Sequence, residues 1–371
     1  MRSLLQWVLV AVGALMAAGT ALSFSRSPHW LVRGWDFPRA QIAALAGASA
    51  ALYSAIFFEG RAWEWAWLAA AALAVAWQCV KIRPFTRLAR VHVKRAAPGE
   101  LRERADAAFR LLICNVRMEN RERERFLRAV RRHDPDVVLA LETDEGWVRD
   151  LEPLRRTYPH TVLQPQDNYY GMALYSRLPL VEPRVRFLVQ DDIPSVHTGV
   201  ELRSGDRLTL HGLHPRPPEP LRDQDSTPRD AELVLVGREI GDGPARPTVV
   251  AGDLNDVAWS PTSELFLRLS GLLDPRVGRG MFNSYNAGNP LFRFPLDHVF
   301  HSADWELVRL ERLESVGSDH FPILAELLYC PAARAEQPAM PEEPGDREDA
   351  EERIEKEVEA ARTGDDRPGR E

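Results

Sequence analysis

The first eighty residues contain three apolar stretches, which constrain the fold more than any other feature of the sequence. They span residues 4–24, 41–58 and 63–80, and the first has no charged residue over 21 positions. A helix needs about 20 apolar residues to cross a bilayer, and these stretches are apolar on all sides rather than along one stripe. We therefore expect three transmembrane helices within residues 1–80.

Two other interpretations of this region stay open. Small residues near the end of the first stretch, in the sequence ALMAAGTALS, are also typical of a secretory signal peptide. A soluble helical bundle is the second alternative. The two further stretches favour membrane helices, and so do four tryptophans near the ends of the third stretch, as in an aromatic belt: Trp63, Trp65, Trp67 and Trp77.

Basic residues are distributed unevenly around these stretches. Arg26, Arg33 and Arg39 follow the first stretch and six more basic residues follow the third, whereas the opposite side has Arg2 and Arg61. The positive-inside rule therefore places the C-terminal part of the chain in the cytoplasm. Because the rule weakens when a long domain follows, export of that part is the alternative. Arginine outnumbers lysine 44 to 3, which fits a bacterial protein of the cytoplasmic membrane.

The net charge of -7 is divided unequally along the chain. Residues 1–110 have a net charge of +8, residues 111–330 have -8, and residues 331–371 have -7. A nonspecific nucleic-acid-binding protein normally presents a basic face, which the central segment lacks. We interpret residues 81–108 as a basic linker. Residues 331–371 are charged and poor in aromatic residues, so we expect a disordered acidic tail there, with at most one transient helix around 350–361.

From residue 109 onward, short apolar runs alternate with amphipathic ones. The pattern predicts strands at 109–116, 136–142, 171–177, 247–255, 295–302 and 321–328, a hairpin at 198–204 and 207–215, and helices at 121–133 and 231–240. Many short strands with helices between them, over about 220 residues, are typical of a layered α/β sandwich.

Polar residues recur at the ends of these expected strands. Each ends an apolar run or begins one, and together they would meet at one edge of a stacked sheet: Asn115, Glu142, His214, Asp253, Asn255, Asp297, Asp319 and His320. Buried carboxylates without a counter-charge are unfavourable, so this cluster favours a bound cation. Carboxylate and amide oxygens suit Mg²⁺ or Mn²⁺, and the three cysteines indicate neither a zinc site nor a disulfide framework. The histidines can contact a phosphate or move a proton near neutral pH.

These motifs resemble those of the endonuclease/exonuclease/phosphatase superfamily. The resemblance rests on Asn115, Glu142 and His214, with GDLND at 252–256, LDHVF at 296–300 and GSDHFPI at 317–323. The superfamily includes pancreatic deoxyribonuclease, abasic-site endonucleases, neutral sphingomyelinases and inositol polyphosphate 5-phosphatases. The resemblance covers residues 109–330 and implies a catalytic domain there, a four-layer α/β sandwich of two packed mixed β-sheets flanked by helices.

The resemblance also implies the metal ligands. Glu142 matches the metal-binding glutamate of the superfamily, Asn115 the asparagine beside it, and Asp319 the aspartate near the metal. The implied cofactor is Mg²⁺ or Mn²⁺.

The remaining site residues match the superfamily's catalytic groups. Asp253 and Asn255 match the residues that orient the attacking water and the phosphate. His320, oriented by Asp297, matches the histidine that contacts the scissile phosphate, and His214 matches a second histidine on the phosphate side.

The segment after His214, HPRPPEP, departs from the Thr-His-Leu pattern common in the nucleases. Its prolines would stiffen the loop beside the site. Arg216 in this segment, and Arg293 just before the LDHVF motif, are candidates for binding a substrate phosphate.

We therefore expect a membrane-anchored, Mg²⁺-dependent phosphohydrolase that cleaves phosphodiesters by in-line attack of a metal-activated water. Its expected partners are the lipid bilayer and a phosphate-ester substrate, either nucleic acid or a phospholipid headgroup. A lipid phosphate or inositol phosphate is the alternative substrate class. A second alternative is a catalytically silent membrane scaffold that uses its acidic tail to recruit other proteins.

Overall fold

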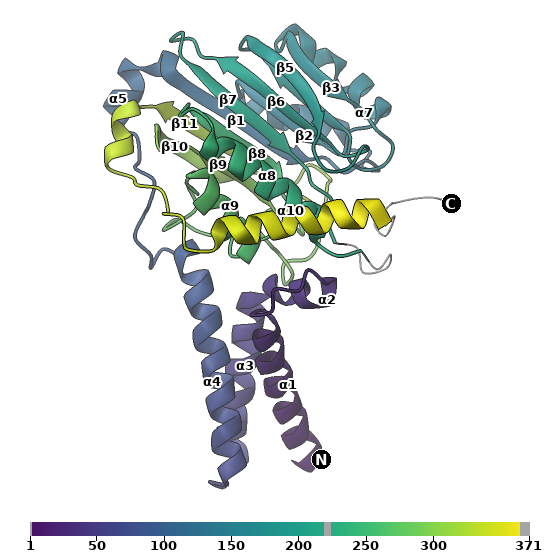
Figure 1. Ribbon diagram of the computed structural model, residues 1–371, viewed down its shortest axis with the longest axis vertical. Coiled ribbons are helices and arrows are strands. Elements are labelled where there is room, and N and C mark those ends of the chain that lie inside the picture. Colours follow the sequence, from purple (N-terminus) through teal and green to yellow (C-terminus); the bar gives the residue numbers. More distant parts are fainter. Residues whose placement is uncertain (1, 219–223, 364–371) are drawn as a thin grey trace. The chain divides into compact units, whose positions relative to one another are not determined.

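The computed structural model describes residues 2–218 and 224–363 (Figure 1), and the chain divides into two compact units. The first consists of Met1–Arg90 with Pro218–Ser226, and the second of Val91–Pro217 with Thr227–Glu371. Apart from the short segment assigned to the first unit, the predicted catalytic domain lies within the second.

Three long helices make up most of the first unit. They are α1 (Arg2–Leu22), α3 (Arg39–Ile56) and α4 (Ala62–Ile82), and α2 (Trp30–Arg33) with the 3₁₀ helix η1 (Gly34–Asp36) precedes α3. By length and composition, the described residues contain two segments that could cross a membrane, Leu4–Leu22 and Ala62–Phe85. The prediction of three membrane helices is therefore corrected. The stretch predicted at 41–58 does form a helix, α3, but its alanine, glycine and serine residues make it less apolar than the other two.

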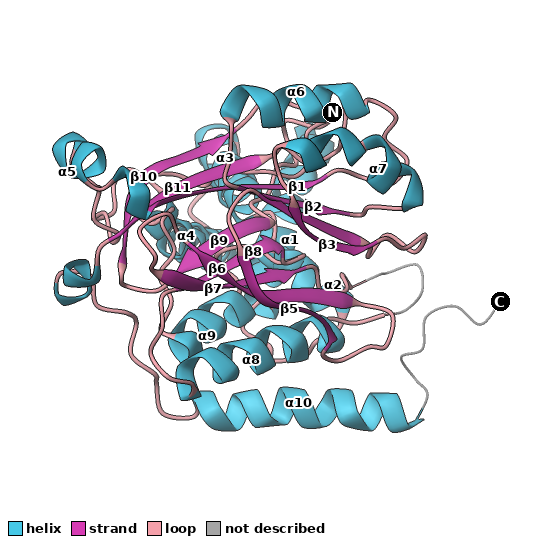
Figure 2. Cartoon of the chain, turned by 90° about the horizontal axis from the view of Figure 1, so that it is seen from above, coloured by secondary structure: helices cyan, strands magenta, loops and turns pink. Residues whose placement is uncertain are grey.

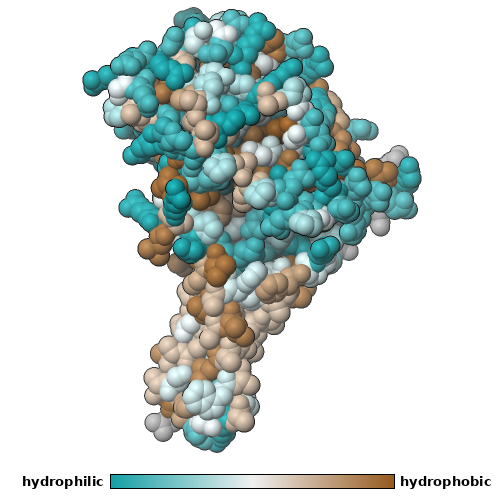
Figure 3. Space-filling view, turned by 60° about the vertical axis from the view of Figure 1, so that its left-hand side comes forward, coloured by the Kyte–Doolittle hydropathy of each residue, from teal (hydrophilic) through white to brown (hydrophobic). Residues whose placement is uncertain are grey.

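Polar side chains lie between these helices, and apolar side chains lie on their outer surface. Arg39 donates to Gln78 Oε1 (2.9 Å) and Gln78 donates to Thr20 Oγ1 (2.9 Å), and all three residues are buried. Leu73, by contrast, is 72% exposed, and apolar residues cover much of these helices in the space-filling view (Figure 3). Polar groups inside a helical bundle and apolar groups outside it are typical of membrane proteins.

Two mixed β-sheets form the centre of the second unit. The first sheet has six strands in the order β10-β11-β1-β2-β4-β3, and the second has five in the order β5-β6-β7-β8-β9. Each sheet contains one parallel pair, β1–β2 or β7–β8, among antiparallel neighbours. The strands of the first sheet are β1 (Ala108–Asn115), β2 (Val137–Leu141), β3 (His160–Gln164), β4 (Met172–Ser176), β10 (Trp305–Arg312) and β11 (Ile323–Tyr329). Those of the second are β5 (Leu180–Phe187), β6 (Pro194–Glu201), β7 (Arg207–Leu213), β8 (Thr248–Asp253) and β9 (Asp297–His301).

Helices cover the outer face of each sheet, so the unit has the layers helix, sheet, sheet and helix (Figure 2). On the first sheet these are α6 (Arg123–His133), α7 (Glu145–Asp150) and the 3₁₀ helix η4 (Glu152–Arg156), and on the second sheet α8 (Thr227–Asp242) and α9 (Pro261–Ser270). Buried apolar side chains such as Leu111, Leu139 and Val249 fill the space between the sheets. The predicted arrangement of two mixed sheets flanked by helices is confirmed.

Helix α6 shows how the sequence directs this packing. Phe126, Leu127 and Val130 recur at helical spacing and are buried against the first sheet, while the surrounding arginines face solvent. The helix ends at Asp134, whose φ of 46° is left-handed, and Pro135 prevents its continuation.

Three strands were not predicted from the sequence, and all three lie at the edge of a sheet: β3, β5 and β10. Their side chains are partly exposed along much of their length. Because an edge strand need not bury a continuous apolar run, the alternation that marks a strand is weak in these segments.

The segment predicted as a basic linker, 81–108, is ordered over most of its length. It contains η2 (Arg83–Phe85), α5 (Pro98–Glu103) and η3 (Ala105–Ala107). Its second half also pairs with the edge strand β10, because Leu307 donates its backbone N–H to Lys94 O (2.9 Å) and Ala96 donates to Leu307 O (3.0 Å). The second unit therefore begins at Val91.

The segment predicted as a disordered tail, 331–371, instead contains η6 (Pro331–Ala335) and the long helix α10 (Asp346–Thr363); residues 364–371 lie outside the described part. Ala350 and Ile354 of α10, four residues apart, pack against Val234 of α8 and Leu265 of α9. Arg268 of α9 also forms two hydrogen bonds with Asp346 (2.7 and 2.8 Å). A helix around 350–361 was expected to be transient; instead a narrow apolar stripe docks it, and the high charge of the segment hides that stripe in the sequence.

Candidate active site

Strand topology brings the predicted polar residues to the same edge of each sheet. In the first sheet, β1 ends at Asn115, which is paired with Leu141 at the end of the parallel strand β2, and antiparallel β11 begins just after His320. In the second sheet, β8 ends at Asp253, directly paired with Asp297 at the start of antiparallel β9.

Asn115 connects the two sheets at this edge. Its Nδ2 donates to Glu142 Oε1 (2.7 Å) and to Asp253 Oδ2 (3.2 Å), and its Oδ1 accepts the backbone N–H of Arg117 (3.0 Å). Asn115 was predicted to be a metal ligand. In the structure its amide nitrogen bridges two acids and its oxygen accepts one backbone hydrogen bond, and its role as a ligand stays a prediction.

Glu142 is held in a constrained position beside Asn115. Its φ of 59° is left-handed, which is unusual for a non-glycine residue and tends to occur at functional sites. Met118 donates its backbone N–H to Glu142 Oε2 (3.4 Å). Burial raises the pKa of the Glu142 carboxyl, and the negative charge of Asp319 adds to this, whereas the hydrogen bond from Asn115 opposes it. A cation beside Glu142 would relieve both effects.

His320 lies between the two aspartates of the second sheet. Its Nδ1 donates to Asp297 Oδ2 (2.7 Å), and its Nε2 is 3.4 Å from Asp253 Oδ2. Burial alone would lower the pKa of His320, but the charges of Asp297 and Asp253 outweigh it and raise the pKa to about 10. The ring is therefore a cation at neutral pH, and Asp297 fixes its orientation.

Burial raises the pKa of the Asp253 carboxyl above its ordinary range, and the positive charge of His320 opposes this rise. Asp253 Oδ1 accepts the backbone N–H of Asn255 (3.0 Å). Asn255 has a left-handed φ of 50°, and its Nδ2 donates to Pro215 O (2.9 Å). Gly252 allows the strand to approach β7 closely here, because a Cβ at this position would lie 1.9 Å from Leu213 O.

His214 is the second predicted histidine and differs from His320 in charge. Its Nε2 is 3.9 Å from Asp253 Oδ2, and burial lowers its pKa to about 3, so the ring is neutral at pH 7. The ring of Tyr170 lies 5.5 Å away between ring centroids. Among the described residues, no group hydrogen-bonds to His214 Nδ1.

Asp319 is half-buried, and the loop around it is tied to the first sheet through Ser318. Ser318 Oγ donates to Asn115 O (2.7 Å) and accepts the backbone N–H of His320 (3.0 Å). Asp319 also receives a backbone hydrogen bond at its carbonyl from Ala287 (2.7 Å). The loop 281–294 therefore adjoins the site.

The two candidate phosphate-binding arginines differ in position. Arg216 is buried two residues after His214. Arg293 lies on the loop 281–294, where its guanidinium donates to the carbonyls of Asn286 (3.1 Å) and Ala287 (3.2 Å) and stacks on Phe321. Substrate binding by either residue stays a prediction.

Three residues beside the predicted site were not predicted to be functional: Tyr285, Tyr170 and Ser318. Tyr285 lies 4.9 Å from His320 between ring centroids, and no motif or periodicity marks it in the sequence. Tyr170 lies beside His214. Ser318 lies within the GSDH motif, which is a signal for it, but no role was predicted for this residue.

The donor set fits a hard divalent cation. Carboxylate oxygens of Asp253 and Asp297 lie within 4.8 Å of each other and of a ring nitrogen of His320, the one such group among the described residues. Because the His320 ring is protonated, the carboxylates are the groups here that can act as ligands, and Asp297 Oδ1 is buried without a hydrogen-bond partner. The carboxylate oxygens of Glu142 lie next to this group through Asn115. Oxygen donors without a thiolate suit Mg²⁺ or Mn²⁺. Asp253 and Asp297 were predicted as catalytic residues. Their positions also suit metal ligands.

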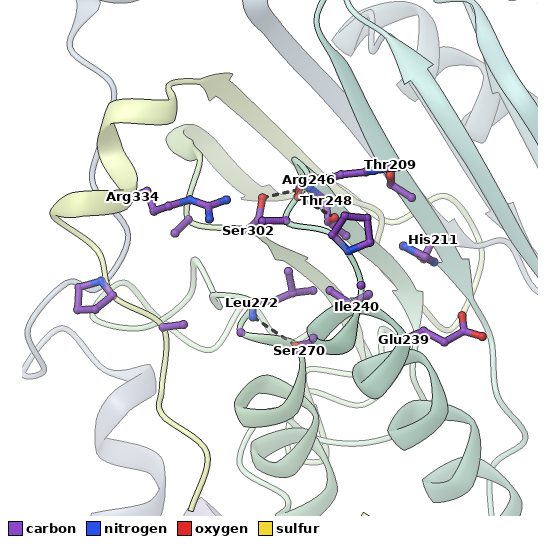
Figure 4. Close-up of a pocket in the computed structure, with 18 residues that line it drawn as sticks. Thr209, His211, Glu239, Ile240, Arg246, Thr248, Ser270, Leu272, Ser302 and Arg334 are labelled. Atoms are coloured by element: carbon purple, nitrogen blue, oxygen red, sulfur yellow. Dashed lines mark hydrogen bonds between the residues drawn. The ribbon is translucent and has the colours of Figure 1, made fainter. Parts of the chain in front are cut away.

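A separate cavity of about 540 Å³ lies at the opposite ends of β7 and β8, beside the paired residues Thr209 and Thr248 (Figure 4). His211 also lines it, and its Nδ1 is 2.7 Å from His197 Nδ1. None of the predicted site residues lines this cavity, so it is distinct from the acidic cluster.

The fold and the acidic, histidine-containing edge together define a class, the α/β-sandwich hydrolases that cleave phosphoric esters with a divalent metal. Residues 112–320, more than half of the chain, match the sequence profile of the Endonuclease/Exonuclease/phosphatase family, and the chain belongs to this family. Members of this family are metal-dependent hydrolases of phosphoester bonds, and so is this enzyme.

Several solved structures are similar to about 60% of the chain. A humanised TDP2 of D. rerio is 17% identical with a TM-score of 0.47, and 99% of its length is covered. The catalytic domain of human Nocturnin with bound sulfate is 16% identical with a TM-score of 0.49, and an endonuclease/exonuclease/phosphatase family protein from Bacteroides thetaiotaomicron is 19% identical with a TM-score of 0.49; each is covered over 95% of its length. No curated protein matches the sequence.

Proposed function

We propose that the protein is a membrane-anchored, Mg²⁺-dependent phosphodiesterase. The observation that carries this proposal is the contact between the sheets, where Asn115 bonds the carboxylates of both Glu142 and Asp253 while the His320–Asp297 pair lies against Asp253. This arrangement places acids, an amide and a cationic imidazole around one point, as hydrolysis of a negatively charged ester requires.

Four side chains have separate roles in the reaction. The Asp253 carboxylate takes a proton from a water molecule, and Asn255, fixed by Pro215 and by Asp253, orients the phosphate. The His320 imidazolium donates from Nε2 to a phosphate oxygen, and Asp297 holds the ring. The water oxygen forms a new P–O bond and the ester P–O bond breaks opposite to it. The leaving oxygen takes up a proton from solvent, and Asp253 releases its proton to solvent.

Glu142 and Asp319 would hold the divalent ion. When bound, the ion supplies charge neutralisation at a nonbridging phosphate oxygen and at the leaving oxygen.

Two observations favour a phospholipid headgroup as the phosphodiester over a nucleic acid. Residues 111–330 have a net charge of -8, which repels a polyanion. In addition, Leu291 and Phe292 on the loop 281–294 are 73% and 52% exposed, and this loop is hydrogen-bonded to Asp319. Exposed apolar side chains beside a polar site suit a substrate that carries acyl chains.

Hydrolysis of bis-p-nitrophenyl phosphate by the full-length protein in detergent tests the proposal. We expect turnover with Mg²⁺ or Mn²⁺, its loss on addition of EDTA and its return with excess Mg²⁺. Failure of every divalent metal to support turnover would favour the silent scaffold. Parallel assays with phospholipid vesicles, inositol phosphates, DNA and RNA identify the substrate class, and a preference for DNA or RNA would contradict the lipid assignment.

We further propose that the second unit lies on the cytoplasmic face of a bacterial cytoplasmic membrane. The arginines and lysines that follow the first and third apolar stretches favour this orientation. A protease added outside intact cells should then leave the C-terminal segment uncut. Digestion of that segment in intact cells would show the opposite orientation.

A further inference from the structure

The backbone carbonyl of Asn255 is the end of a chain of buried ionic contacts. Arg229 of α8 donates from Nη1 to Asn255 O (2.9 Å), and the same nitrogen lies 3.5 Å from Asp256 Oδ1. Nε and Nη2 of Arg229 both donate to Asp230 Oδ1 (2.9 and 2.7 Å). Arg229 is fully buried, so its guanidinium holds the backbone carbonyl of Asn255 in place.

The second oxygen of Asp230 extends this chain to the C-terminal helix. Arg353 of α10 donates from Nη1 to Asp230 Oδ2 (3.3 Å) and to Thr262 Oγ1 of α9 (2.7 Å). Asp349, one turn earlier on α10, accepts from Nε and Nη2 of Arg353 (3.2 Å each). Arg353 thus joins α8, α9 and α10 at one point, where the three helices lie side by side (Figures 1 and 2).

The charges along this chain alternate. Two arginines, Arg229 and Arg353, face two buried carboxylates, Asp230 and Asp256. Loss of Arg353 would remove a positive charge beside Asp230, and the attraction of this buried carboxylate for Arg229 would become stronger. Arg229 would then be drawn away from the carbonyl of Asn255.

We infer that Arg353 is a positioning residue for the active site, and that α10 contributes to catalysis by supporting the position of Asn255. The inference rests on the proposed role of Asn255 in orienting the phosphate. Helix α10 lies beyond residues 112–320, the part of the chain that matches the family. The helix therefore adds a support for Asn255 that the matched region does not include.

Kinetics of the Arg353→Ala variant of the full-length protein test this inference. With bis-p-nitrophenyl phosphate and saturating Mg²⁺, we expect kcat to fall about 10- to 100-fold, the cost of a small displacement of a group that orients the substrate, while KM stays within about twofold. Arg353→Lys should restore most of the lost kcat, because lysine keeps the positive charge opposite Asp230. It should not restore all of it, because lysine lacks the fork of hydrogen bonds that the guanidinium forms.

Arg347→Ala is the matched control. Arg347 is also on α10 and pairs with Asp242 of α8 (3.0 Å), but its side chain is 51% exposed and it has no connection to Asn255. This variant should keep the kcat of the wild type. Unchanged kcat in Arg353→Ala, or an equal loss in Arg347→Ala, would overturn the inference.

Two further variants keep the outcome clear. If Arg353→Ala does not fold, as judged by thermal unfolding, Asp349→Asn retains Arg353 but removes the carboxylate that orients it, and the same kcat loss on a smaller scale is expected; wild-type kcat in that variant would refute the inference. Asp253→Ala reports on the proposed function separately. If Asp253→Ala is as active as the wild type, the proposed function fails, whereas activity lost in Asp253→Ala but not in Arg353→Ala rejects the role of α10 alone.

Discussion

Replacement of His320 by alanine is expected to lower kcat for a phosphodiester by about 10²- to 10⁴-fold, the range for removal of a positioned proton donor or charge-stabilising group. The reason is the charge of the ring. Asp297 and Asp253 outweigh the effect of burial and hold the pKa of His320 near 10, so the imidazolium persists at neutral pH. Its function depends on the proton and is lost only as the pH rises toward that pKa. Steady-state kinetics with Mg²⁺ at pH 7 measure the effect.

His160→Ala is the control for this experiment, because His160 is exposed on the edge strand β3. It should retain full activity. The role assigned to His320 is wrong if a folded His320→Ala protein keeps more than about a tenth of the wild-type kcat, given the range above.

Replacement of Glu142 by glutamine should raise the Mg²⁺ concentration for half-maximal activity by at least about tenfold, since a charged ligand of a hard cation becomes a neutral one of the same size. Burial and the charge of Asp319 both raise the pKa of Glu142, which means that the charged carboxylate is unfavourable there without a cation. The variant should therefore be at least as stable as the wild type in EDTA, so unfolding would not explain a loss of activity. Activity measured across a Mg²⁺ titration, with thermal unfolding in EDTA, tests both statements.

Glu145→Gln, three residues further along the chain and exposed on α7, should leave the Mg²⁺ dependence unchanged. An unchanged Mg²⁺ requirement in Glu142→Gln would remove Glu142 from the metal site.

The central part of the fold was predictable because its strands are buried and therefore continuously apolar. The runs predicted at 109–116, 136–142 and 247–255 form strands β1, β2 and β8, which end at Asn115, Leu141 and Asp253. The edge strands β3, β5 and β10 are partly exposed, and the docking stripe of α10 consists of few apolar side chains among many charges, so neither produces a clear pattern. The stretch at 41–58 was predicted to be a membrane helix because it is apolar on all sides, but its alanine, glycine and serine residues make α3 less apolar than α1.

The candidate site was predictable only in part. The sequence predicts that polar groups gather at one edge of the sheets, because the strands there end in polar residues. The direction of the Asn115 amide, the bond between His320 and Asp297, and the place of Tyr285 depend on tertiary contacts between residues far apart in the chain. The contact of Arg353 with Asp230 spans 123 positions and is invisible to any local pattern.

Diffraction from crystals grown with Mn²⁺, collected at the manganese absorption edge, tests most directly whether side chains from both sheets surround one hard cation. The account predicts an anomalous peak about 2.1 Å from a carboxylate oxygen of Glu142, a distance typical of such ions, with Asp319 or Asp253 beside it and His320 facing the same space. An empty edge in a crystal that binds Mn²⁺ elsewhere, or a peak bound without Glu142, would contradict it.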